Sequence, residues 1–186
     1  GPDLVGQSAL GGCEVRWYKE MSQVPKGPTL LIAHEFFDAL PVHQFERTER
    51  GWCERLLDIA DESEPEHLRF VLSPQPTPAS HLLVRHRADG LLAAPPPGMT
   101  EEDVLSLKQL EISPKSMAIT MDIAERIGTH GGGALLLDYG HNRPCGLTLQ
   151  GIRKHEFVDL LDDPGSADLS AYVDFSALHQ AVAEVA

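Results

Sequence analysis

Two short apolar runs, each followed at once by polar residues, constrain the fold of this chain most. The first run covers residues 29–33 and leads into a segment that begins at His34; the second covers residues 133–137 and leads into one that begins at Asp138. Apolar runs without alternation are typical of strands that helices cover on both faces. Because ligands of open α/β sheets bind just beyond the carboxyl ends of such strands, the two polar segments predict a shared functional crevice.

The charge balance of the chain narrows its range of partners. Its 186 residues contain 28 Asp and Glu against 15 Lys and Arg, which gives a formal net charge of −13. Nucleic-acid binders need cations that displace counterions from phosphates, so we expect no nucleic-acid partner and favour a basic peptide or protein. No apolar run approaches the ~18 residues of a membrane span, so none is predicted.

Neither a metal site nor a disulfide is predicted. The spacing of His34, Glu35 and His43 matches no zinc signature. The three cysteines are far apart and odd in number, which favours unpaired thiols.

Further strands and helices are predicted on both sides of these runs. Residues 43–48, 52–59 and 67–72 read as extended segments separated by turns, which indicates an antiparallel ribbon inserted after the first parallel strand. Helices are expected after the capping residues Thr100 and Ser113 and from Asp174 onward. A helix followed by a buried strand is half of a βαβ unit, so an α/β fold is predicted.

The first polar segment offers a pair of carboxylates. Glu35 and Asp38 are three positions apart and share a face if a helical turn begins there. Such a pair could orient a cationic group or act as a general base. The alternative is that Asp38 caps a helix N-terminus. Phe36 and Phe37 are interpreted as core or as the wall of a pocket.

The second polar segment can be read in two ways. Asp138, Tyr139 and His141 could form the other wall of the crevice beside Glu35. Alternatively, Gly140 makes a tight turn, Asp138 binds backbone amides and His141 is solvated. The residue pattern alone leaves both readings open.

The same segments resemble the MidA family of S-adenosylmethionine-dependent methyltransferases. Residues 32–45, residues 131–141 and the stretch from His155 to Leu178 follow the order of that family's motifs. The resemblance runs from about Trp17 to Leu178 and is weakest over residues 85–110. That stretch, rich in Pro, Gly and charge, is interpreted as a peripheral, mobile and variable insertion within a single partial domain, residues 1–186.

The resemblance implies a partial Rossmann-like class I methyltransferase sheet and S-adenosyl-L-methionine as cofactor. Mitochondrial members of the family are credited with methylating an arginine of a complex I core subunit, which implies a basic protein substrate and a place in the mitochondrial matrix. By family position, Glu35 and Asp38 would hold the guanidinium, and Trp17 and His34 would lie near the cofactor. The crevice itself would be lined by Phe36, Phe37, Asp138, Tyr139 and His141.

The resemblance also has a gap. The family's Gly-rich turn and its acidic ribose-binding residue lie upstream of Trp17, so the chain is expected to be a fragment that binds the cofactor weakly alone. Two alternatives are a non-catalytic binding or assembly module, and a methyltransferase that acts on a small molecule or another side chain.

Overall fold

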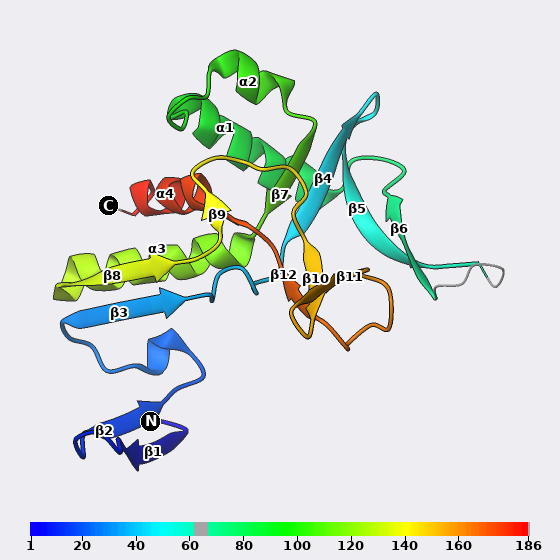
Figure 1. Cartoon of the computed structure of the whole chain (residues 1–186). Coiled ribbons are helices and arrows are strands. Elements are labelled where there is room, and N and C mark those ends of the chain that lie inside the picture. Colours follow the sequence, from blue (N-terminus) through cyan, green and yellow to red (C-terminus); the bar gives the residue numbers. More distant parts are fainter. Residues whose placement is uncertain (62–66, 186) are drawn as a thin grey trace.

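A pair of parallel strands carries both polar segments at one edge. The computed structural model describes residues 1–61 and 67–185. Strand β3 (Thr29–His34) pairs in parallel with β8 (Gly132–Leu137), in a register that sets Thr29 against Gly132 and His34 against Leu137 (Figure 1). The prediction that the two strands are adjacent is confirmed, and both polar segments leave the sheet at the same end.

The long helix α3 (Pro114–His130) returns the chain to this sheet. Ser113 caps it, because its hydroxyl accepts the backbone N–H of Ser116 at 3.2 Å, as the sequence predicts. Gly132 then allows β8 to meet β3 closely. Its φ is +120°, and a Cβ there would lie 1.9 Å from the carbonyl oxygen of Thr29, so no other residue fits without moving the strand.

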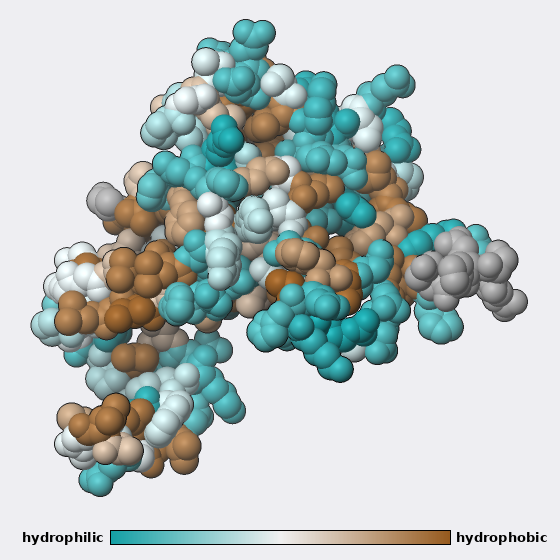
Figure 2. Space-filling view, in the orientation of Figure 1, coloured by the Kyte–Doolittle hydropathy of each residue, from teal (hydrophilic) through white to brown (hydrophobic). Residues whose placement is uncertain are grey.

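The two-stranded sheet is covered on one face, whereas the sequence predicts helices on both. Leu31 and Leu136 face inward and pack in the cluster around α3. On the other face Leu30 is 90% exposed and Ile32 is 73% exposed, and Leu135 is also exposed. Figure 2 shows the resulting apolar surface over β3 and β8. Within the described part of the chain, an unbroken apolar run has therefore formed a strand with one buried and one exposed face.

A separate antiparallel sheet follows β3. It contains β4 (His43–Thr48), β5 (Gly51–Ile59), β6 (Leu68–Leu72) and β7 (Gln109–Ile112), in the order β6-β5-β4-β7. The predicted antiparallel pairing of the first three strands is confirmed by their registers. Strand β7 was not predicted. It completes the sheet beside β4 and leads directly into α3 (Figure 1).

Short strands and helices complete the chain. The strands are β1 (Leu4–Gln7), β2 (Glu14–Trp17), β9 (Gly140–His141), β10 (Gln150–Arg153), β11 (Glu156–Val158), β12 (Asp168–Ser170) and β13 (Val173–Asp174). The helical segments are a 3₁₀ turn (Met21–Gln23), a π-helical turn (Ser80–Val84), α1 (Arg85–Ala93), α2 (Glu101–Ser106) and α4 (Phe175–Ala183). The predicted caps Thr100 and Asp174 are confirmed, since each side chain accepts a backbone N–H of its helix.

Residues 85–110 belong to the core rather than to a peripheral loop. Leu91 and Leu110 are each 1% exposed, and Arg87 is 2% exposed. The Arg87 guanidinium donates to Asp174 at 2.7 Å and to Gln180 at 2.8 Å, so α1 is tied to the start of α4. This buried ion pair gives the segment an architectural role, so the expected peripheral position is wrong, while its mobility and variable length stay predictions.

Two apolar clusters form the core. One joins the antiparallel sheet to α3 and α4 and includes Phe45, Leu110 and Met117. The other joins the parallel pair to the same helices and includes Phe37 and Ile123. Helices α3 and α4 therefore hold the two sheets together. No helix within the described residues has the length and apolar character needed to cross a membrane.

Candidate active site at the ends of the parallel strands

Glu35 projects an exposed carboxylate from the end of β3. Its φ of +48° lies in the left-handed region, which is uncommon for a residue with a side chain and is found at functional sites. Its backbone N–H donates to the carbonyl of Leu137 at 2.9 Å, which fixes the turn against β8. Its Oε1 lies 3.5 Å from Nε2 of His34 and accepts the hydroxyl of Tyr139 at 3.4 Å. The carboxylate is thus positioned by one side chain from each strand end.

Asp138 connects the two strand ends through backbone amides. Its Oδ2 accepts the N–H groups of Phe36, Phe37 and Asp38 at 3.1, 2.9 and 3.3 Å, and its Oδ1 accepts that of Tyr139 at 2.9 Å. The reading in which Asp138 binds backbone amides is confirmed. Its carboxylate shapes the first polar segment and has little capacity left for a substrate.

Asp38 is partly buried and lies in the turn that follows β3. No helix begins there, so the alternative role as a helix cap is wrong. Its Oδ2 accepts the Ser170 hydroxyl at 3.0 Å, and its carbonyl accepts the N–H of Ala171 at 2.9 Å. Its Oδ1 is buried and has no hydrogen-bond partner within the described part of the chain. A buried carboxylate oxygen normally has a donor, and a single ordered water would supply one here.

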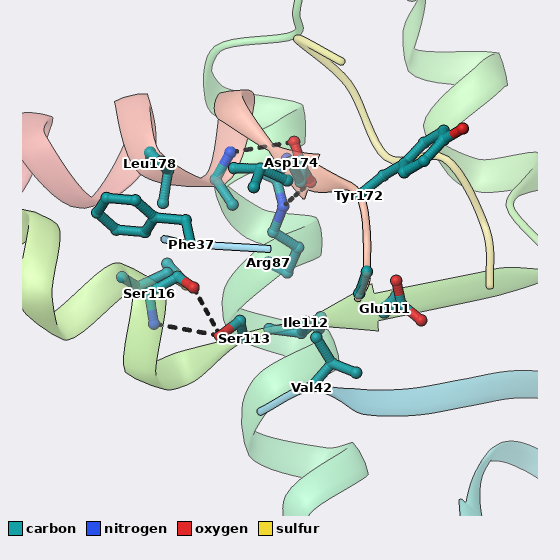
Figure 3. A pocket seen from close by; sticks show the side chains of 14 residues that line it. Phe37, Val42, Arg87, Glu111, Ile112, Ser113, Ser116, Tyr172, Asp174 and Leu178 are labelled. Atoms are coloured by element: carbon teal, nitrogen blue, oxygen red, sulfur yellow. Dashed lines mark hydrogen bonds and ion pairs between the residues drawn. The ribbon is translucent and has the colours of Figure 1, made fainter. Parts of the chain in front are cut away.

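The two phenylalanines between these carboxylates have different roles. Phe36 is 44% exposed, whereas Phe37 is 3% exposed and meets it edge-on at 5.3 Å between ring centroids. Phe37 lines a small internal cavity with Leu178 and the Arg87–Asp174 pair (Figure 3). The cavity holds about 30 Å³, enough for a water but not for a substrate side chain. Phe37 is therefore core, whereas Phe36 is exposed and its place at the crevice stays a prediction.

His141, which the family resemblance places at the crevice, lies on a short strand beyond Tyr139. Strand β9, which carries His141, pairs in parallel with β13, and the His141 ring lies 5.8 Å from the Tyr172 ring. Tyr172 in turn donates its N–H to the Thr148 hydroxyl at 2.8 Å. Glu111 of β7 accepts that hydroxyl and the N–H of Thr148, the latter at 3.2 Å. The sequence reasoning missed Glu111, which links the antiparallel sheet to Tyr172 through Thr148; Figure 3 shows Glu111 and Tyr172 around the internal cavity.

Replacing Gly140 by alanine should displace His141 from this site. A Cβ at Gly140 would lie 2.1 Å from the carbonyl oxygen of Val173, so the pairing of β9 with β13 would have to open. We expect a loss of about 1–3 kcal/mol in the free energy of unfolding, measured in urea. Gly128→Ala is the matched control, because a Cβ there meets nothing within 4 Å. Equal stability of the two variants would contradict the close approach.

Comparison with known proteins decides the family. Residues 6–186 match the family described as "Putative S-adenosyl-L-methionine-dependent methyltransferase". The chain belongs to this methyltransferase family. The mitochondrial protein arginine methyltransferase NDUFAF7 of Danio rerio is 40% identical over 169 residues, covering 91% of this chain and 36% of that protein. The human protein of the same name is 39% identical and is covered over 34% of its length.

Solved structures agree on the fold. A Burkholderia thailandensis protein bound to S-adenosyl-homocysteine superposes on 91% of this chain with a TM-score of 0.62 and 24% identity. This chain covers 40% of that protein and about a third of the curated methyltransferase relatives. The coarse prediction of an α/β methyltransferase fold and the predicted family are thereby confirmed.

Trp17 and His34, which the family resemblance places near the cofactor, lie on the surface of the structure. Trp17 is 49% exposed at the end of β2, where its ring packs beside Gly6. The His34 side chain is 66% exposed beside Glu35. Neither lines the cavity of Figure 3. Trp17 could stack on S-adenosylmethionine and His34 could hydrogen-bond to it, but each side chain is exposed and neither encloses it.

Proposed function

We propose that this chain is part of a protein arginine N-methyltransferase of the mitochondrial matrix. Its substrate would be a basic protein, specifically an arginine of a complex I core subunit, and S-adenosyl-L-methionine would be its cofactor. Membership of the methyltransferase family and the names of the NDUFAF7 relatives support the reaction class. The net charge of −13 suits a basic partner.

The exposed Glu35 carboxylate is the observation that carries this proposal. Carboxylates bind the planar guanidinium fork in two-point fashion, so Glu35 would orient a nitrogen of the target arginine. Tyr139, 3.4 Å from Oε1, would hold the carboxylate in place. Asp38, three positions after Glu35, would be the second carboxylate of the site, as the family resemblance implies. The cofactor, when bound, supplies an electrophilic methyl group, and these residues contribute by positioning the nucleophile.

The same proposal extends to the architecture of the whole protein. We propose that β3 and β8 belong to a Rossmann-like class I sheet into which the antiparallel strands β4, β5 and β6 are inserted. Residues 1–186 would then form part of one domain in which the length of the 85–110 segment varies between relatives. The parallel register of β3 and β8 supports this arrangement.

Replacing Glu35 by glutamine should lower methyl transfer to an arginine peptide at least tenfold. The change keeps the shape of the side chain and removes the charge that holds the guanidinium, and hydrogen bonds to charged groups contribute about 1.5–3 kcal/mol. Transfer of labelled methyl from S-adenosylmethionine measures the effect in the full-length protein. A peptide with lysine in place of the target arginine reports the side-chain preference.

Glu49→Gln is the matched control, since Glu49 lies exposed in the turn between β4 and β5. We expect that variant to keep its turnover, and we expect cofactor affinity to change little in either variant. Unchanged turnover in Glu35→Gln would remove Glu35 from the mechanism. Equal transfer to lysine and arginine peptides would refute the substrate class.

A further inference from the structure

A wide polar groove opens beside the candidate active site. It lies between α2 and the segment that follows β9 and has a volume of about 590 Å³. Its polar lining includes Asp103, Lys108, His141 and Arg143. A space of this size accommodates several residues of an extended peptide, in contrast to the 30 Å³ cavity behind Phe37.

The groove begins where the candidate active site ends. His141 belongs to both, and Tyr139, two positions earlier, contacts Glu35 through its hydroxyl. Tyr139 and Arg143 are four positions apart in the chain, so their Cα atoms lie no more than about 14 Å apart. An extended peptide covers that distance in about four residues. A substrate whose arginine reaches Glu35 can therefore place a nearby residue in the groove.

The groove lining holds two basic residues, Lys108 and Arg143, and one acidic residue, Asp103. Lys108 and Arg143 are exposed, and neither makes an ion pair within the described part of the chain. Asp103 is the acidic residue of the lining, and its Oδ2 accepts both the hydroxyl and the N–H of Thr100 at 2.7 Å. The Thr100 side chain and then its backbone N–H lower the pKa of Asp103, which stays engaged as part of the cap of α2.

The surrounding charge makes this pair of cations distinctive. The chain as a whole has a formal charge of −13, so most of its surface repels anionic ligands. The groove lining, with two cations and one anion, departs from this overall balance. Arginine and lysine side chains bind carboxylates by charge-assisted hydrogen bonds, with arginine able to bind them in two-point fashion.

We propose that this groove binds an acidic residue of the substrate protein, within about four positions of the methylated arginine. Lys108 and Arg143 would bind its carboxylate, while Glu35 holds the guanidinium of the target. The inference rests on the proposed function, because it takes Glu35 as the position of the target arginine. It deepens that function by naming the sequence context that the enzyme selects: a basic target with an acidic neighbour.

Binding of fluorescein-labelled peptides to the full chain, followed by anisotropy, tests the groove directly. One peptide carries an arginine with a glutamate four positions away on either side, and a second has glutamine at both of those sites. We expect the glutamate peptide to bind about tenfold more tightly, since two charge-assisted contacts are gained. The preference should shrink in high salt, because exposed charges are screened.

Paired charge variants separate the groove from the general charge of the protein. Lys108→Gln with Arg143→Gln should abolish the preference for the glutamate peptide. The double variant Lys115→Gln with Arg50→Gln removes the same charge from exposed positions outside the groove. It should keep the preference for the glutamate peptide. Equal preference in the two double variants would overturn the proposal, and so would tighter binding of a single-stranded RNA of equal charge.

The two proposals fail in different ways in this assay. A peptide in which lysine replaces the target arginine tests Glu35 as the recognition point, and the glutamate-to-glutamine change tests the groove. If the arginine preference is lost but the glutamate preference still depends on Lys108 and Arg143, the proposed function fails and the acidic-residue site stands. If the arginine preference survives and the glutamate preference is absent, the groove proposal is wrong.

Discussion

Replacing Arg87 by methionine is expected to lower the free energy of unfolding by about 3–5 kcal/mol, because it leaves a buried carboxylate without its partner. Arg87 is 2% exposed and donates to Asp174 through both Nε, at 3.2 Å, and a terminal nitrogen, at 2.7 Å. Asp174 would keep its cap bond to the N–H of Ala177 at 3.2 Å but lose its counter-charge. Urea unfolding followed by circular dichroism measures the loss.

Arg85 provides a control on the same helix. Its side chain is 84% exposed and lies 3.7 Å from Asp89, one helical turn away. We expect Arg85→Met to change stability by less than about 0.5 kcal/mol, the usual value of an exposed pair. If the two variants lost the same stability, the buried pair would not hold α1 and α4 together.

Asp138→Ala is expected to cost about 3 kcal/mol of stability, because hydrogen bonds to a charged acceptor are the strong ones. The alanine variant leaves the N–H groups of Phe36, Phe37 and Asp38 without the oxygen that all three share. Hydrogen exchange should show faster exchange at these three amides than in the wild-type protein. The stability of Asp138→Asn, which keeps a neutral acceptor, should lie between those of the wild-type protein and the alanine variant.

Asp159 serves as the comparison for that experiment. It is exposed, and within the described residues its carboxylate accepts one N–H, that of Leu161, at 2.8 Å. We expect Asp159→Ala to cost less than about 1 kcal/mol and to leave exchange at residues 36–38 unchanged. A loss at Asp138 no greater than at Asp159 would show that the shared oxygen contributes little.

The sequence was sufficient to predict the elements that place the site. Unbroken apolar runs at 29–33 and 133–137 located β3 and β8, and the polar residues after each run located the edge where they end. Capping residues such as Ser113 fixed the start of α3. These signals are local in the chain, so the physical reasons for them can be read without knowing the fold.

Features that depend on distant partners could not be predicted. Arg87 lies in a helix without a clear apolar stripe, and only the approach of Asp174, 87 positions later, makes it a core residue. Glu111 looks like any strand carboxylate until Thr148 meets it. The exposure of Leu30 and Ile32 has the same origin, since an apolar run does not reveal whether one face or two will be covered. For Asp138, two readings were open because the choice depended on amides 100 to 102 positions away.

The separation between Asp138 and the amides it binds has a consequence for folding. Phe36 and Asp138 are 102 positions apart, so the chain must close a loop of that length before the edge of the sheet can form. Closing it costs about 2 kcal/mol more in chain entropy than closing a ten-residue hairpin. Long-range parallel pairing of this kind is slow compared with local hairpins and helices. During synthesis, the antiparallel strands and α3 can form first, and the turn that carries Glu35 becomes ordered only after residue 138 has emerged.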